Sequence, residues 1–240
     1  LAVVGPLARR AEDLTVALSV TAGAESGSGW RLDLPSPRRT SLRNHRVLIL
    51  DQHPVARTAN VLREALHGLA DNLARAGADV RVDVDDLPDL EAAHHAYGTM
   101  LTAVTTRGVP GVQPVSAHAW MELLDVQMRL ARSWKRVFEQ VDVVLTPPFG
   151  VPAFPHEDQP DWALRTLMID GEATPYGRQV AWPGVATFPG LPATAAPIGR
   201  TAEGLPMGIQ IIGDMYADHT TLAFAGHLER EGLAGFVAPS

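Results

Sequence analysis

A strand, a helix and a second strand follow one another between residues 46 and 84, and this order limits the chain to few folds. Residues 47–50 read VLIL, a continuous apolar run typical of a strand buried on both faces of a parallel sheet. Pro54 suits the first position of a helix, and apolar residues recur at helical spacing until Gly77. The alternating valines that follow, Val80, Val82 and Val84, predict a second strand. Together these features predict an α/β fold.

Ligands of such units gather at the carboxyl ends of the parallel strands. Asp51 and His53 come directly after the first strand, which makes them candidates for a site. Turn formation and helix capping are the alternative role for both side chains. No G-x-G-x-x-G or P-loop sequence follows the strand, so dinucleotide and phosphate binding lack support.

The remaining periodicity predicts elements along the rest of the chain. We expect helices at 6–22, 116–141 and 217–231, strands at 141–146, 193–198 and 208–212, and an irregular or weakly helical segment at 87–112. His94 and His95 lie in that irregular segment. Because adjacent residues of a helix point about 100° apart, the two could not hold one metal ion without other ligands. We therefore predict no metal site.

Composition narrows the function further. The chain has 240 residues, of which 46% are hydrophobic, and no long linker interrupts it, so we expect a single domain over 1–240. A net charge of -7 argues against nucleic acid as a partner. The absence of Cys excludes disulfides and thiolate chemistry. No apolar run approaches the roughly 18 residues that span a bilayer, so we expect no membrane partner and a cytoplasmic location.

Four segments, in order, resemble the amidase signature family. Residues 5–14 read GPLARRAEDL, and residues 46–84 carry the strand, helix, AGA-x-V and strand unit described above. Residues 142–147 read DVVLTP and are preceded by Gln127-Met128-Arg129. The most specific match joins Gly190-Leu191-Pro192-Ala193 to residues 204–213, which read GLPMGIQIIG. The resemblance implies the C-terminal part of this fold, with a mixed, mostly parallel sheet covered by helices.

The family hydrolyses carboxylic amides to acid and ammonia through a serine acyl-enzyme, with a neutral Lys and a second Ser relaying the proton. In the family these groups precede the segments found here, so the resemblance implies that the N-terminal catalytic core is missing. Lys135 is the only lysine and lies in a basic helical run. The run Ser26-Gly27-Ser28-Gly29 lacks the Gly two residues before a Ser that a nucleophile elbow requires. We expect no catalytic residue, and no amidase activity, in this chain alone.

The resemblance also implies an acyl pocket, walled by the proline-rich loop after residue 147 and by the segment before Gly190. Mapped onto this sequence, the wall contains Phe149, Val180, Trp182 and Phe188. Their apolar character predicts a substrate with a neutral, hydrophobic acyl group, and no charged residue of the kind that accompanies glutamine use stands at 179–182. The alternative is that all four are ordinary core residues.

The sequence thus predicts an amidase portion that acts on a small-molecule amide and uses no cofactor. Its expected partners are the missing N-terminal half or further copies of itself in a homo-oligomer. A non-catalytic subunit or pseudoenzyme that binds an acyl ligand or a partner is a second possibility. A small-molecule binding module built on the strand-helix-strand unit is a third.

Overall fold

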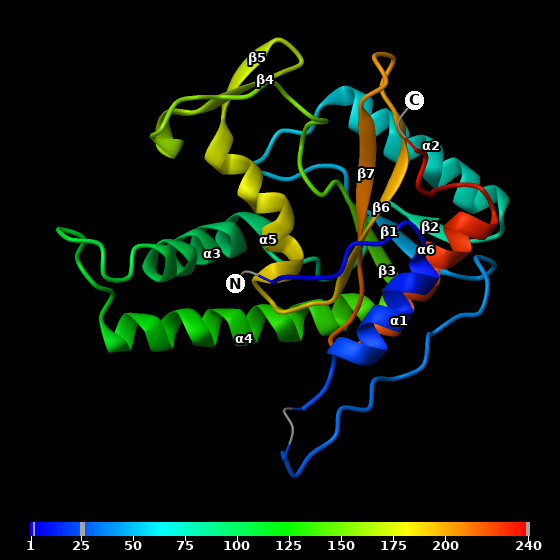
Figure 1. Cartoon of the computed structure of the whole chain (residues 1–240), viewed down its shortest axis with the longest axis horizontal. Coiled ribbons are helices and arrows are strands. Elements are labelled where there is room, and N and C mark those ends of the chain that lie inside the picture. Colours follow the sequence, from blue (N-terminus) through cyan, green and yellow to red (C-terminus); the bar gives the residue numbers. More distant parts are fainter. Residues whose placement is uncertain (2, 25–26, 239–240) are drawn as a thin grey trace.

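The computed structural model describes residues 1, 3–24 and 27–238, so Ser26 of the Ser/Gly run lies outside the described residues. A five-stranded sheet crosses the middle of the molecule in the order β2-β1-β3-β7-β6 (Figure 1). Its strands are β1 (Arg46–Ile49), β2 (Asp79–Arg81), β3 (Val143–Thr146), β6 (Ala193–Arg200) and β7 (Pro206–Ile212). A separate antiparallel hairpin is formed by β4 (Thr166–Ile169) and β5 (Glu172–Pro175).

The helices are α1 (Ala11–Thr21), α2 (Asn60–Arg75), α3 (Leu90–Thr105), α4 (Ala117–Gln140), α5 (Ala181–Thr187) and α6 (Asp218–Arg230). Two short 3-10 turns, Trp162–Leu164 and Tyr176–Val180, flank the hairpin. The α/β class and the mixed sheet covered by helices are confirmed. Within the main sheet β1 pairs in parallel with β2 and β3, whereas β7 pairs antiparallel with β3 and β6.

Both faces of the sheet are buried, which explains why its central strands read as continuous apolar runs. Val47 and Val143 belong to a core with α2 and α6, against which α1 packs. Leu48 and Val144 face the opposite core, formed with α4 and α5. Because successive side chains of a strand point to opposite faces, each position needs an apolar residue.

The helix after β1 begins at Asn60, not at Pro54 as the sequence predicts. The backbone groups of the intervening segment are bound by distant partners instead of by a first helical turn. The N–H of Ala59 donates to the carbonyl of Gly150 at 2.7 Å, and the carbonyl of Arg57 accepts from Gln179 at 2.9 Å. Tertiary hydrogen bonds therefore hold residues 51–59 as a loop.

Two further boundaries differ from the expectation. The segment expected to be irregular or weakly helical, 87–112, contains a regular helix, α3, capped by the Asp89 side chain, which accepts from the N–H of Ala92 at 2.9 Å. Tyr97 and Met100 of α3 are buried and hold it against Phe188. The first helix begins at Ala11 because the Ala11 N–H donates to the Glu229 carboxylate of α6, at 3.0 Å.

Candidate functional site

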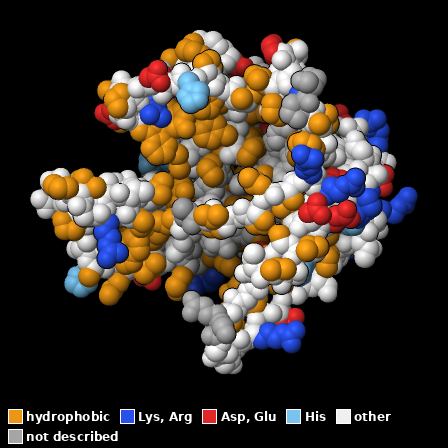
Figure 2. All heavy atoms as spheres, in the orientation of Figure 1, with side chains coloured by type: hydrophobic (Ala, Val, Ile, Leu, Met, Phe, Trp, Pro, Cys, Tyr) orange, Lys and Arg blue, Asp and Glu red, His pale blue; other side chains and the backbone are white. Residues whose placement is uncertain are grey.

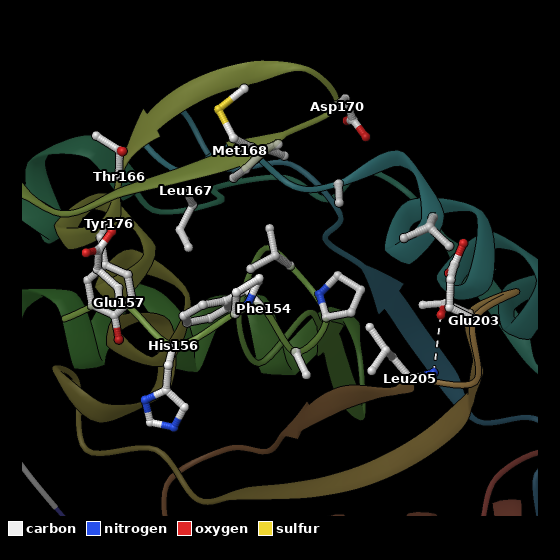
Figure 3. Close-up of a pocket in the computed structure, with 18 of the residues that line it drawn as sticks. Phe154, His156, Glu157, Thr166, Leu167, Met168, Asp170, Tyr176, Glu203 and Leu205 are labelled. Carbon is white, nitrogen blue, oxygen red and sulfur yellow. Dashed lines mark hydrogen bonds between the residues drawn. The ribbon is translucent and has the colours of Figure 1, made fainter.

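A cavity of about 700 Å³ lies beside the β4–β5 hairpin. Its walls come from residues 151–157, from the hairpin, from the start of α2 and from the turn between β6 and β7 (Figure 3). Most of the lining is apolar, including Val151, Phe154, Leu167 and Leu205. In Figure 2 hydrophobic side chains also gather in the hollowed surface between the hairpin and α3. A concave apolar cavity of this size is typical of small-molecule sites.

Four aromatic rings form a cluster at one side of this cavity. Phe154 and Tyr176 line it, with ring centroids 5.9 Å apart. Phe149, a predicted pocket residue, lies behind them at 6.1 Å from Phe154 and 5.8 Å from Tyr176. Trp162 extends the cluster at 5.5 Å from Tyr176. The structure thus places Phe149 in contact with the cavity wall.

The charged side chains of the cavity are mainly acidic. Glu157, Asp170 and Glu203 line it together with His156, and within the described part of the chain no Lys or Arg does so. The Asp170 carboxylate accepts from the N–H of Asn60 at 3.1 Å and so caps α2. A hydrogen bond from the Thr201 hydroxyl lowers the pKa of Glu203 below its usual value. These carboxylates give the cavity a negative rim.

Phe188 and Val180, two other predicted pocket residues, belong to a different cluster. Phe188 is fully buried and its ring lies 5.8 Å from that of Tyr97 in α3. Its carbonyl accepts from Nε2 of Gln127 at 2.6 Å, which ties α4 to the end of α5. Val180 is half-buried and packs against the same cluster. Both residues join α5 to the pair of helices α3 and α4.

Trp182, the fourth predicted residue, is fully buried beneath the loop that follows β1. Its ring lies edge to face with that of His53, with centroids 5.5 Å apart. Burial, with a smaller effect of His94, lowers the pKa of His53 to about 4. Trp182 Nε1, Thr58 Oγ1 and His94 Nδ1 are buried without a hydrogen-bond partner among the described residues. The loop thus places neutral polar groups, among them the His53 ring, against the apolar ring of Trp182.

Asp51, the other candidate after β1, is engaged within the chain. Its Oδ2 atom accepts from Nε of Arg63 at 2.9 Å and lies 2.9 Å from Nε2 of His67. The two α2 side chains therefore fix Asp51 at the end of the strand. Over the described residues, no group of three or more His, Asp or Glu side chains is arranged to hold a metal ion.

The four predicted pocket residues belong to three separate clusters: Trp182 lies within α5, Val180 and Phe188 lie at its two ends, and Phe149 lies in the aromatic cluster beside the cavity. Phe154, Leu167 and Tyr176, which line the cavity itself, were not predicted. One signal could have located the hairpin that carries Leu167. The pair Asp170-Gly171 stands between two short β-prone runs, and both residues have positive φ, 50° and 81°.

Lys135 and Ser116 belong to α4 and its N-terminal cap. Lys135 is exposed on α4, next to the buried Trp134. Ser116 caps α4, where its hydroxyl accepts from the N–H of Ala119 at 3.1 Å. Among the residues that the structure describes, no hydrogen bond joins Lys135 to a serine. None of the described helices is long and apolar enough to cross a membrane.

Comparison with known proteins identifies relatives along the chain. A fatty acid amide hydrolase from Medicago truncatula is 31% identical over 60% of this chain and 22% of its own length. An indoleacetamide hydrolase from Bradyrhizobium japonicum is 26% identical over 98% of this chain and 52% of its own length. Where a relative matches nearly the whole chain, the chain thus spans about half of that relative.

Solved structures share the fold. The structure of a bacterial aryl acylamidase of the amidase signature family matches 94% of this chain and 52% of its own chain, with a TM-score of 0.66 and 19% identity. A fatty acid amide hydrolase structure matches 95% of this chain and 48% of its own, with a TM-score of 0.71 and 18% identity. The Amidase family model matches residues 98–222, more than half of the sequence. The chain belongs to the amidase signature family.

Proposed function

We propose that the chain is the C-terminal portion of a hydrolase that converts a carboxylic amide to the acid and ammonia. The observation that carries this proposal is the family match over residues 98–222. The indoleacetamide hydrolase and the fatty acid amide hydrolase are both named for the amides that they cleave, and both support an amide as the substrate. We also propose that residues 1–240 form a single folded unit.

The attacking groups come from outside this chain in our proposal. A serine hydroxyl attacks the amide carbonyl while its proton passes through a second serine to a neutral lysine. Backbone N–H groups stabilise the oxyanion, ammonia leaves, and water cleaves the acyl-enzyme. Lys135 does not suit this role because it is exposed on α4 and, among the residues that the structure describes, forms no hydrogen bond with a serine. The chain alone is therefore inactive.

The contribution of this chain is the acyl-binding wall. Trp182 lies in α5, Val180 and Phe188 lie at its two ends, and Phe149 lies in the aromatic cluster beside the cavity. We propose that these four residues set the preference for a neutral, hydrophobic acyl group. Phe149 supports the proposal most directly because its ring packs behind the two aromatic residues that line the 700 Å³ cavity. Trp182 and Phe188 are fully buried and hold α5 in position behind this wall.

A non-catalytic subunit is the second candidate. The chain is 31% identical, over 45% of its length, to a glutamyl-tRNA(Gln) amidotransferase component from Gluconobacter oxydans, a protein named as one subunit of that enzyme. A chain with an open apolar cavity and no lysine-serine pair in its described part fits a role in binding an acyl ligand or a partner. Glutamine use itself gains no support, because no charged residue stands at 179–182.

The experiment expresses the chain together with the reading frame that precedes it in the genome. Ammonia release is measured with acetamide and with a bulky aryl amide, and the ratio of the two kcat/KM values is compared between wild type and Phe149→Ala. Loss of an aromatic contact of about 1–3 kcal/mol lowers the preference for the aryl amide by about 5- to 150-fold. Trp30→Ala, which changes an exposed ring, is the matched control.

Two results would count against the proposal. If the extended protein is folded but releases no ammonia from any amide, the hydrolase proposal is wrong and the non-catalytic subunit remains. An unchanged ratio in Phe149→Ala with a lowered melting temperature assigns Phe149 to the core.

A further inference from the structure

The cavity beside the hairpin combines apolar walls with a negatively charged rim. Its floor is apolar, and three of its five ionisable side chains are carboxylates, those of Glu157, Asp170 and Glu203. Asp170 is engaged at the start of α2. Glu157 and Glu203 form no ion pair with any Lys or Arg in the described part of the chain. Both carboxylates therefore add negative charge to the rim of the cavity.

Aromatic rings line or adjoin the same cavity. Phe154 keeps 41% of its surface exposed although its ring contacts Phe149 and Tyr176. Trp162, next to Tyr176, keeps 50% exposed. Aromatic faces carry partial negative charge and attract cations within about 6 Å of the ring centroid. The aromatic rings and the carboxylates thus both favour a positively charged ligand.

We propose that this cavity binds a ligand with an aromatic body and one protonated amino group. The body packs on the apolar floor beside Leu167 and Leu205, and the ammonium is attracted by the exposed ring of Phe154 and by the negative charge that Glu157 and Glu203 give the rim. Figure 3 shows Phe154 in the middle of the cavity, with Glu157 and Glu203 toward its two sides. The inference concerns binding alone and does not depend on amide hydrolysis.

The test uses three probes with the same aromatic body and different charge. Purified chain is titrated calorimetrically with 3-phenylpropylamine, 3-phenylpropanol and 3-phenylpropanoate at about pH 7.5, where the amine is protonated and the acid ionised. The expected order of affinity is amine, then alcohol, then acid. Because exposed charges are screened by salt, about 0.5 M NaCl narrows the gap between the amine and the alcohol.

Variants separate the charge from the apolar wall. Glu157→Gln combined with Glu203→Gln lowers the affinity for the amine by about fivefold and leaves the alcohol unchanged. Phe154→Leu keeps an apolar side chain but removes the aromatic face, so it weakens the amine more than the alcohol. Glu122→Gln on α4, at an exposed position that does not line the cavity, is the matched control and leaves all three affinities unchanged.

Several outcomes would overturn the proposal. If the alcohol or the acid binds as tightly as the amine, the cavity has no preference for a positively charged ligand. Equal losses in the double variant and in Glu122→Gln place the effect outside the cavity. If no probe gives a heat of binding at about 10 mM while a cooperative melting transition shows that the chain is folded, the cavity does not bind this class of ligand.

Discussion

The side chain of Gln179 accepts a hydrogen bond from the backbone N–H of Gly150, at 2.9 Å, in the buried space between two loops. Its other end donates to the carbonyl of Arg57 at 2.9 Å. One fully buried amide therefore connects the loop after β1, the loop after β3 and the turn that begins α5. These three segments together position the cavity and the proposed acyl wall.

Gln179→Leu should destabilise the chain because it leaves the Gly150 N–H and the Arg57 carbonyl buried without partners. The expected cost is about 2–3 kcal/mol in the free energy of unfolding, measured by urea titration. Gln113→Leu, at an exposed position, should change it by less than about 0.5 kcal/mol. Equal stability of Gln179→Leu and wild type would show that the amide does not hold the loops.

Gly184→Ala tests the packing of α5 against α3. A Cβ atom at Gly184 would come within 2.8 Å of the Tyr97 ring, which is itself buried. Overpacking of this kind should cost about 1–3 kcal/mol, measured by thermal or urea unfolding. Gly68→Ala in α2 is the matched control, because nothing lies within 4 Å of its Cβ position. That control should stabilise the chain by about 0.5–1 kcal/mol, since Ala favours a helix interior. If Gly184→Ala and Gly68→Ala changed the free energy of unfolding in the same direction, this expectation would be wrong.

The pH dependence of stability should contain a contribution from His53. Burial lowers its pKa to about 4, whereas the unfolded chain has the ordinary value near 6.5. The unfolded state therefore takes up a proton first, so stability is complete above about pH 6.5 and falls as the pH decreases toward 4.

The measurement compares unfolding free energies of wild type and His53→Gln at about pH 7.5 and about pH 4. Acidification should cost wild type up to about 3 kcal/mol more than it costs the variant. Parallel pH curves for the two proteins would show that His53 is not held neutral by the fold.

Asp142 should contribute stability through a charged carboxylate, whereas His53 contributes through a neutral ring. Burial alone raises the pKa of the Asp142 carboxylate, but hydrogen bonds from Arg46 and Arg39 outweigh burial and hold the pKa below its usual range. This stabilisation is present above the ordinary Asp pKa and is lost as the pH falls through the lowered value.

Asp142→Asn should therefore reduce the unfolding free energy at neutral pH by about 2 kcal/mol, since the arginines remain partly hydrated. The difference between the variant and wild type should shrink below about pH 4. A difference that stays constant down to about pH 2 would mean that the charge of Asp142 is not responsible.

The central strands β1 and β3 of the main sheet could be predicted because their signals are local and repeated, whereas the strand expected through Val82 and Val84 ends at Arg81. Residues 47–50 and 143–146 are apolar at nearly every position, which is the pattern of strands covered on both faces, and the structure buries most of them. The helix α4 shows one apolar face, and its observed bounds lie within one residue of those expected. Local periodicity decides these elements.

The cavity could not be predicted because its geometry depends on contacts between distant segments. Pro54 would start a helix on local grounds, but Gly150 and Gln179 bind the backbone of residues 57–59 and delay the helix to Asn60. The cavity wall formed by Phe154 and Tyr176 arises only once the hairpin folds back over residues 151–157. No local periodicity in the sequence predicts contacts between segments so far apart in the chain.

Ammonia release by the purified chain tests the central claim most directly, because the account assigns this chain an acyl wall and no attacking group. With simple aliphatic and aryl amides as substrates, we expect no ammonia above the background of buffer alone. Lys135→Ala should be indistinguishable from wild type in this assay. Turnover by the chain that disappears in Lys135→Ala, or on replacement of a serine such as Ser133, would contradict the account.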